Sequence, residues 1–237
     1  MKFQEPHSWQ LSPSQAQKLQ LELASRISKN NEVNKPRYIV GVDISKPNSA
    51  GIGRAAAVVL SYPDLQLVEV AIAEGKLPFP YIPGLLSFRE APLILAACQK
   101  LSQDPDLVLV DGQGIAHPRR FGIASHLGLI LDTPTIGCAK SRLCGQHQLP
   151  ASKTGSYAYL THEDETIGAV LRTKTDVSPV YVSIGHKIDL PTAIYWASHC
   201  CRGHRLPEPC RLAHLAASGN PIATMKVPVS VDLKPFT

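Results

Sequence analysis

The order of strand and helix patterns is the feature that most limits the fold of this chain. Three short apolar segments rich in β-branched residues come first, joined by short connections that are typical of antiparallel strands. These segments are residues 37–43, 54–60 and 65–73. Helical and strand patterns then alternate, at residues 85–101, 107–111, 121–129 and 135–138. Because such alternation is typical of βαβ units, the sequence predicts an α/β fold with a mixed central sheet flanked by helices.

Patterns at both ends extend this arrangement. An amphipathic helix is predicted over residues 12–28, with Ser12 as its N-cap. A hairpin, a further strand and two helices are predicted after the alternating region, at residues 156–160, 166–172, 180–184, 191–201 and 209–217. We expect residues 1–237 to form a single domain whose catalytic core covers about 37–217, with a loose tail over the last dozen residues.

The composition argues against several classes of protein. The chain has 237 residues, of which 44% are hydrophobic and 18% are charged, and no stretch approaches the roughly 18 apolar residues of a membrane span. The first ten residues contain no apolar core of a signal peptide, and the six cysteines form no CxxC pair. We therefore expect a soluble protein of the reducing cytoplasm, without disulfides. The net charge of +5 permits a polyanionic partner but is too small to require one.

Two acidic residues end predicted strands. Asp43 closes the first strand segment, and Asp111 closes the strand over residues 107–111. If these strands are parallel neighbours, both carboxylates emerge at one edge of the sheet and can share a divalent cation such as Mg²⁺ or Mn²⁺. Such a cation stabilises the oxygens of a phosphoryl displacement. Each Asp alone is also typical of an ordinary turn, and Glu90 is typical of a helix start, so the inference depends on their combination.

The run that begins at Asp111 reads Asp-Gly-Gln-Gly-Ile-Ala-His-Pro-Arg-Arg. Gly112 and Gly114 have no side chain and let the backbone approach a ligand closely. His117 and Arg119 follow the strand end as candidates for phosphate contacts. A plain glycine turn followed by a solvated helix start explains the same residues without any ligand.

Five blocks of sequence together resemble the endonuclease V family. They are Val42-Asp43, Pro80 to Leu86, Phe88-Arg89-Glu90, Asp111 to Arg119, and Gly137 to Ser141. The blocks come in the family's order, and the similarity extends from about residue 37 to about residue 217. The resemblance implies a ribonuclease H-like fold with a mixed five-stranded central sheet. It also implies Mg²⁺-dependent nicking of DNA that contains deoxyinosine, at the second phosphodiester bond on the 3′ side of the lesion, which leaves a 5′-phosphate and a 3′-hydroxyl.

The resemblance also implies roles for individual residues. Asp43 and Asp111 would bind the metal, with Glu90 completing the acidic cluster and His214 near the catalytic centre. The loop of Pro80, Tyr81, Ile82, Pro83 and Gly84 would be the wedge that fills the gap left by a flipped base. Leu86, Gly112 and Gly114 would form the base pocket, with the amides of the two glycines facing hypoxanthine. His117, Arg119, Lys140 and His186 would contact phosphates or lie near the DNA.

Other interpretations stay open on the sequence alone. The same site can serve inosine-containing RNA, because the 2′-OH contact that separates RNA from DNA is not readable here. A binding module without catalysis, or a general structure-specific nuclease, would share the fold. Without the resemblance, a histidine such as His214 on a helix is more often structural, and Tyr81 is more often a residue that caps the core. The cysteines and histidines of residues 199–214 invite a zinc site, but their spacing fits no standard finger or ribbon. We expect a monomer whose partner is deoxyinosine DNA.

Overall fold

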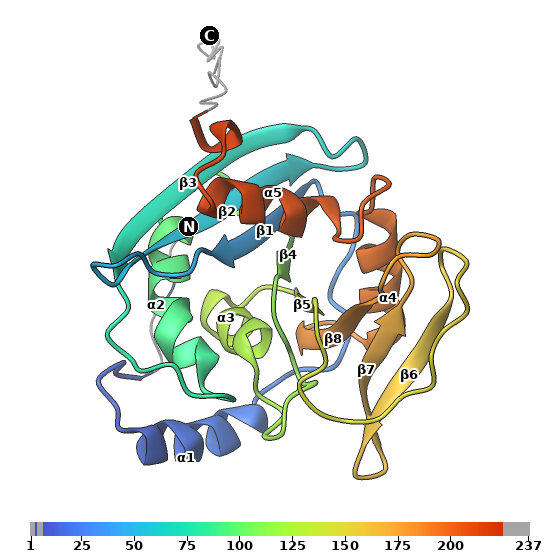
Figure 1. The fold of residues 1–237 in the computed structure, drawn as a ribbon, viewed down its shortest axis with the longest axis horizontal. Coiled ribbons are helices and arrows are strands. Elements are labelled where there is room, and N and C mark those ends of the chain that lie inside the picture. The colour runs from blue at the N-terminus through green and yellow to red at the C-terminus, as the bar shows by residue number, and fades with distance from the viewer. Residues whose placement is uncertain (1–2, 4–6, 225–237) are drawn as a thin grey trace, which may run out of the picture.

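One sheet of eight strands forms the centre of the molecule, and helices cover both of its faces (Figure 1). The computed structural model describes residue 3 and residues 7–224. The strands are β1 (Tyr38–Ile44), β2 (Ile52–Ser61), β3 (Leu67–Lys76), β4 (Leu107–Val110), β5 (Thr135–Ala139), β6 (Tyr157–His162), β7 (Glu165–Leu171) and β8 (Val180–His186). The helices are α1 (Pro13–Ala24), α2 (Leu86–Cys98), α3 (Ile123–Leu131), α4 (Leu190–His199), α5 (Glu208–Ala217) and the short 3-10 helix η1 (Pro221–Thr224).

The sheet is mixed, as the sequence predicts, but it is larger than expected. Strands β1, β4 and β5 run parallel, whereas β2 and β3 pair antiparallel on the β1 side. Strand β8 pairs antiparallel with β5, and the hairpin β6–β7 joins the sheet through β7. The order is therefore β3-β2-β1-β4-β5-β8-β7-β6. The prediction of five strands is wrong because β8 uses the second hydrogen-bonding edge of β5 and brings two further strands with it.

The two faces of the sheet carry separate hydrophobic cores. In β1, Val40 and Val42 point to the face covered by α2 and α3, where they share a core with Ile94 and Leu127. Ile39 points to the opposite face, which is covered by α4 and α5. Because side chains alternate along a strand, one β-branched run supplies both cores, and this is why the segment is apolar at nearly every position.

Gly41, in the middle of β1, lets helix α5 lie directly against the sheet. A Cβ atom built at position 41 would lie 1.9 Å from the carbonyl oxygen of Pro209, which is far inside van der Waals contact. Only glycine therefore permits the backbone of α5 to cross β1 at this height. The crossing fixes where the rest of α5 lies relative to the end of β1.

Most predicted elements are present within a few residues of their expected bounds. Helix α1 begins after Ser12, whose side chain and that of Gln15 form a capping box, but it ends at Ala24 rather than residue 28. The predicted loose tail lies outside the described residues. Within residues 7–224, no helix is both long and apolar enough to cross a membrane.

Candidate active site

Strand pairing brings Asp43 and Asp111 together at one edge of the sheet. Asp43 is the next-to-last residue of β1, and Asp111 directly follows β4. The parallel pair places Val42 opposite Val110, so the residue after each one emerges at the same edge. Asp43, Asp111 and His214 each offer one ligand atom, and these atoms all lie within 4.8 Å of one another. The two acids meet as the strand order predicts.

Helix α5 carries His214 to this acidic edge. The Nδ1 atom of His214 lies 2.7 Å from Oδ2 of Asp43, while Oδ1 of Asp43 accepts a hydrogen bond from the backbone N–H of Ile44 at 2.8 Å. Asp43 is thus oriented through both oxygens. The imidazole is about half exposed, at 49% of its side-chain surface, and Nδ1 is the ring nitrogen that contacts Asp43.

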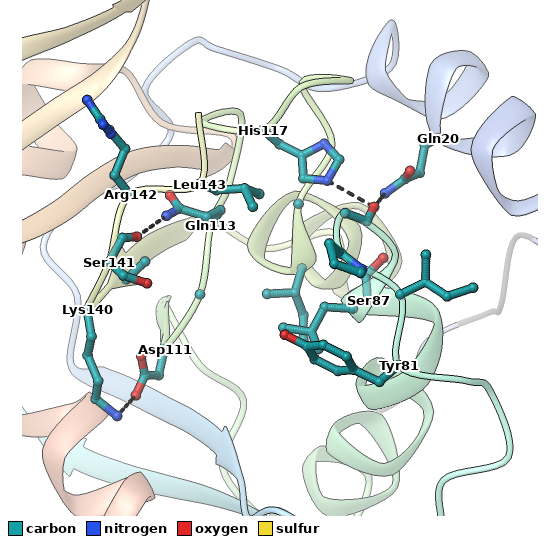
Figure 2. Close-up of a pocket in the computed structure, with 18 of the residues that line it drawn as sticks. Gln20, Tyr81, Ser87, Asp111, Gln113, His117, Lys140, Ser141, Arg142 and Leu143 are labelled. Carbon is teal, nitrogen blue, oxygen red and sulfur yellow. Dashed lines mark hydrogen bonds and ion pairs between the residues drawn. The ribbon is translucent and has the colours of Figure 1, made fainter. Parts of the chain in front are cut away.

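Lys140 supplies a cation to the second acid. It follows β5, the parallel neighbour of β4, and its ammonium forms an ion pair with Oδ2 of Asp111 (Figure 2). The side chain of Asp111 is only 9% exposed, whereas that of Lys140 is 40% exposed. The pair therefore lies at the mouth of the site, where the lysine can meet both the carboxylate and an incoming phosphate.

Glu90 on α2 is the third carboxyl group near the edge. It does not belong to the group of Asp43, Asp111 and His214, whose ligand atoms lie within 4.8 Å of one another. Burial raises the pKa of Glu90 to about 8, the negative charges of Asp43 and Asp111 act in the same direction, and Arg89 opposes them. Burial and the charge of Asp111 also raise the pKa of Asp43, against the hydrogen bond from His214. Three carboxyl groups in this small space repel one another, and a bound cation relieves that repulsion.

The donor set fits a divalent metal ion. Two carboxylates are hard oxygen ligands of the kind that Mg²⁺ and Mn²⁺ prefer. In the part of the chain that the structure describes, Asp43, Asp111 and His214 are the one such group of three. The zinc site considered for residues 199–214 gains no support, because its cysteines belong to no such group.

A cavity of about 540 Å³ opens beside the acidic edge. Its walls come from the loop before α2, the turn after β4 and the segment after β5 (Figure 2). Of the predicted wedge and pocket residues, Tyr81, Ile82, Pro83, Gly84, Leu86 and Gly112 line it. Tyr81 is 73% exposed and stands at the rim, and Pro80 is exposed beside it. A purine base is well within the size of this cavity.

The two glycines do not present their amides to the cavity, contrary to the expectation from sequence. The N–H of Gly114 donates to Oγ of Ser183 at 2.8 Å, and the N–H of Gly112 donates to the carbonyl of Val110 at 2.8 Å. A Cβ atom at Gly114 would lie 1.9 Å from the carbonyl oxygen of Ile184. Gly114 is therefore needed for packing against β8, and only Gly112 contributes to the cavity wall.

His117 and Arg119, predicted from the sequence to contact phosphates, bond to groups within the protein. The Nε2 atom of His117 and Nη2 of Arg119 both bond to the carbonyl oxygen of Gly84, at 3.0 and 2.8 Å. Nδ1 of His117 accepts the backbone N–H of Arg119 at 3.1 Å. With both ring nitrogens used and only 3% of the residue exposed, His117 has no group left for a phosphate.

His186 lies at the opposite end of the strands from the acids. It pairs with Thr135, the first residue of β5, whereas Lys140 follows the last. Its Nδ1 atom accepts the backbone N–H of Ser28 at 3.2 Å, and the residue is 4% exposed. His186, which the sequence places near the DNA, therefore lies away from the acidic edge, because its strand runs antiparallel to β5 and ends at the opposite side of the sheet.

Several cavity residues have no counterpart among those singled out from the sequence. They are Gln20, Lys46, Ser87, Gln113, Ser141, Arg142 and Leu143. Gln20 had a detectable signal, because it occupies the face of α1 shared by Ala16 and Leu23, at helical spacing, where an apolar residue is expected. The others come from loop ends or from a helix turn, where the sequence carries no periodic signal.

The buried state of His117 gives the protein a predictable sensitivity to acid. Burial and the nearby Arg119 lower the pKa of His117 to about 4 in the folded protein, against about 6.5 for an unfolded histidine. Between about pH 4 and pH 6.5, His117 is therefore protonated in the unfolded chain but not in the folded chain. Stability from this residue is complete above pH 6.5 and is lost as the pH falls toward 4, by up to about 3 kcal/mol.

Urea unfolding near pH 7 and near pH 4.5 measures this effect. We expect the free energy of unfolding to fall by about 2 kcal/mol more for the parent than for His117→Gln across this interval, because glutamine does not titrate. Burial also lowers the pKa of His126. This residue is present in both proteins, so its contribution to the loss of stability is the same in each and does not affect the difference. Equal losses in the two proteins would contradict the assigned state of His117.

The fold and the site together define a class of protein. Antiparallel β1, β2 and β3 followed by parallel β4 and β5, with acids at the ends of β1 and β4, define a nuclease with a ribonuclease H-like fold. The model of the Endonuclease V family matches residues 21–215. The chain belongs to the Endonuclease V family, and it is accordingly a nuclease, a hydrolase that acts on nucleic acid.

Individual relatives agree with this family over nearly the whole chain. The Endonuclease V of Dehalococcoides mccartyi strain BAV1 is 52% identical over 218 residues, which cover 92% of this chain and 98% of the relative. The crystal structure of Endonuclease V from Streptomyces avermitilis has a TM-score of 0.85 at 39% identity and covers 90% of this chain and 95% of its own. Endonuclease V of Ciona intestinalis, in complex with a 24mer DNA containing an inosine followed by a ribo-adenosine, has a TM-score of 0.73 at 29% identity, over 85% of this chain and 94% of its own.

Proposed function

We propose that this chain repairs DNA by recognising deoxyinosine and nicking the second phosphodiester bond on the 3′ side of the lesion. The observation that carries the proposal is the position of the acids Asp43 and Asp111 directly beside a cavity whose rim bears an exposed Tyr81. The similarity to an Endonuclease V that was crystallised with an inosine-containing DNA supports the choice of lesion. A cutting site and a base-sized cavity on one surface are what such a reaction needs.

The acidic edge would hold one or two divalent ions, Mg²⁺ or in its place Mn²⁺, through Asp43 and Asp111, with Glu90 as a further carboxylate. A bound ion would polarise the scissile phosphate and lower the pKa of the attacking water. The reaction would leave a 5′-phosphate and a 3′-hydroxyl.

The chain's own groups would orient and neutralise the reactants. With Nδ1 of His214 donating to the carboxylate of Asp43, Nε2 of the neutral ring would be a proton acceptor. It would accept a proton from the attacking water. The ammonium of Lys140 would neutralise charge on the scissile phosphate while remaining within reach of Asp111.

Lesion recognition would use the wedge loop, defined as residues 80–84, and the cavity beneath it. A base must leave the stack before its edge can be inspected, and a mispaired base leaves at lower cost. Tyr81 would fill the gap in the duplex, while Leu86 and Gly112 would contact the flipped base in the cavity. Arg142 and Lys46 line the same cavity and are exposed, which suits them better to phosphate contacts than His117 or Arg119.

We further propose that the chain acts as a single-domain monomer in the cytoplasm. The continuous sheet, whose strands lie between residues 38 and 186, supports one folding unit. All six cysteines are free thiols, in keeping with a reducing compartment.

A gel assay tests the proposed function. Labelled duplexes with one deoxyinosine or with none are incubated with Mg²⁺, with Mn²⁺ or with a chelator. We expect a single nick at the second bond 3′ to the lesion with either metal, and no nick in the chelator or without the lesion. Cutting without the lesion would contradict the recognition step, and cutting in the chelator would contradict the metal site. An absence of cutting with retained binding would indicate a binding module.

Inosine-containing RNA is the second candidate substrate. The DNA in complex with the Ciona intestinalis relative contains an inosine followed by a ribo-adenosine, which supports testing a ribonucleotide next to the lesion. A matched RNA strand, and a DNA strand with one ribonucleotide after the deoxyinosine, belong in the same gel. Faster cleavage of the RNA than of the DNA would reassign the preferred substrate.

A further inference from the structure

The carbonyl oxygen of Gly84, at the end of the wedge loop, is the meeting point of three side chains. Nε2 of Gln20 lies 3.0 Å from it, Nε2 of His117 lies 3.0 Å from it, and Nη2 of Arg119 lies 2.8 Å from it. Figure 2 shows Gln20, from α1, and His117, from the segment after β4, both pointing to this oxygen. We call these three side chains the Gly84 clamp. They join α1 and the segment after β4 to the loop before α2.

The backbone of the wedge loop aims this oxygen at the clamp. The N–H of Leu85 bonds to the carbonyl of Ile82 at 2.9 Å, which closes a tight turn with Pro83 and Gly84 at its centre. Gly84 has a φ of +78°, the value that a type II turn requires at this position. A Cβ atom there would lie 2.8 Å from Nη2 of Arg119. The turn therefore needs glycine both for its dihedral and for the approach of the arginine.

Gln20 uses every polar atom of its side chain in this network. Its Nε2 also donates to the carbonyl of Phe121 at 3.0 Å, and its Oε1 accepts from Nε of Arg119 at 2.6 Å. The residue is 1% exposed. One amide thus links the wedge loop to the segment that leads into α3, which forms the other wall of the cavity. Loss of this amide would leave buried polar groups without partners.

The other end of the wedge loop is held as well. Nη1 of Arg89 donates to the carbonyls of Phe79 and Leu77. Phe79 and Leu85, on either side of the loop, pack into one apolar cluster with Ala16 of α1. Only the tip between these anchors, with Tyr81, projects from the surface. The loop is therefore fixed at both ends and free at the point that would enter a duplex.

We propose that Gln20 is a positioning residue that holds the wedge loop ready to enter a duplex beside the lesion. The inference rests on the proposed function. A loop that is ordered before DNA arrives loses less conformational freedom on binding. The benefit is largest where the strands must be separated, because a single strand presents its base without unpairing. Gln20 therefore affects cutting of a duplex more than cutting of a single strand.

Two variants of Gln20 test this inference in the full-length protein. Gln20→Met keeps the length of the side chain but has no donor, and Gln20→Glu keeps the acceptor for Arg119 but cannot donate to two carbonyls when ionised. Single-turnover nicking is measured on a deoxyinosine duplex and on the same strand alone, with Mg²⁺. We expect the duplex-to-single-strand ratio of rates to fall on the order of tenfold in both variants, approaching the ratio of Tyr81→Ala.

Leu23→Ala is the matched control, because Leu23 is buried on the same face of α1 but bonds to no part of the clamp. It lowers stability and should leave the ratio unchanged, and thermal unfolding of each variant gives the temperature at which all are folded. If the parent nicks the lesion and both Gln20 variants keep its ratio, this inference is wrong while the proposed function stands. If Leu23→Ala lowers the ratio equally, the effect is loss of α1 packing and the inference is also wrong. A parent that leaves deoxyinosine strands intact refutes the proposed function, and this inference with it.

Discussion

Asp111→Asn should lower nicking of a deoxyinosine duplex by about a thousandfold or more while leaving DNA binding intact. The amide has the shape of the carboxylate but no charge, so it removes a hard oxygen ligand from the acidic edge and the ion pair with Lys140. Asp43→Asn should have a similar effect, because that carboxylate belongs to the same candidate metal site and also orients His214. Affinity should persist, since neither acid attracts a phosphate backbone.

Single-turnover nicking and fluorescence anisotropy with a labelled duplex measure the two properties separately. Asp64→Asn is the matched control, because Asp64 is an exposed turn residue far in sequence from either acid and should behave as the parent. A rate within tenfold of the parent for Asp111→Asn would contradict the assignment of the active site. A loss of binding equal to the loss of rate would mean that the acid acts through the structure rather than through the reaction.

Gly41→Ala should destabilise the packing of α5 against β1 and thereby displace His214 from the active site. The new methyl carbon would lie 1.9 Å from the carbonyl oxygen of Pro209, and backbone atoms cannot yield as a side-chain end can. We expect the free energy of unfolding to fall by about 2–3 kcal/mol as α5 moves off β1. Nicking should fall on the order of a hundredfold in protein that is still folded, because α5 carries His214 away from Asp43.

Gly75→Ala provides the control for adding a methyl group to a strand glycine. Its Cβ would meet only the Cδ1 atom of Leu93, at 3.1 Å, and that atom can turn aside, so we expect a change below about 1 kcal/mol. Urea unfolding and single-turnover nicking are measured for both variants. A Gly41→Ala protein as stable and as active as Gly75→Ala would show that the close crossing of α5 and β1 does not place His214.

The sequence predicts those parts of the fold that are written in local patterns. The two strands predicted to close on Asp43 and on Asp111 are apolar runs bounded by an acid, and parallel pairing puts the two ends together. The extension of the sheet beyond β5 could not be predicted in the same way. Whether β8 pairs with β5 is decided by contacts between distant segments, and nothing in either segment alone records it.

Residue chemistry was equally ambiguous for the basic groups. His117 and Arg119 have donors that suit a phosphate, but the same donors suit a carbonyl oxygen, and only the turn at Gly84 shows which partner they have. His186 follows a glycine at a strand end, as a site residue often does, yet its strand runs in the other direction. Gln20 lay outside every motif, because a single buried amide on a helix leaves one polar letter in an apolar pattern.

The position of β1, β4 and β5 inside the sheet determines which parts of the enzyme can open locally. Each of these strands is hydrogen-bonded on both sides, so their backbone amides are released only when the whole sheet comes apart, whereas β3 and β6 at the rims can fray alone. Asp43 near the end of β1, Asp111 after β4 and Lys140 after β5 should therefore keep their spacing when the outer strands open. The active-site residues are therefore held rigid by interior strands, and local opening is confined to the edge strands β3 and β6.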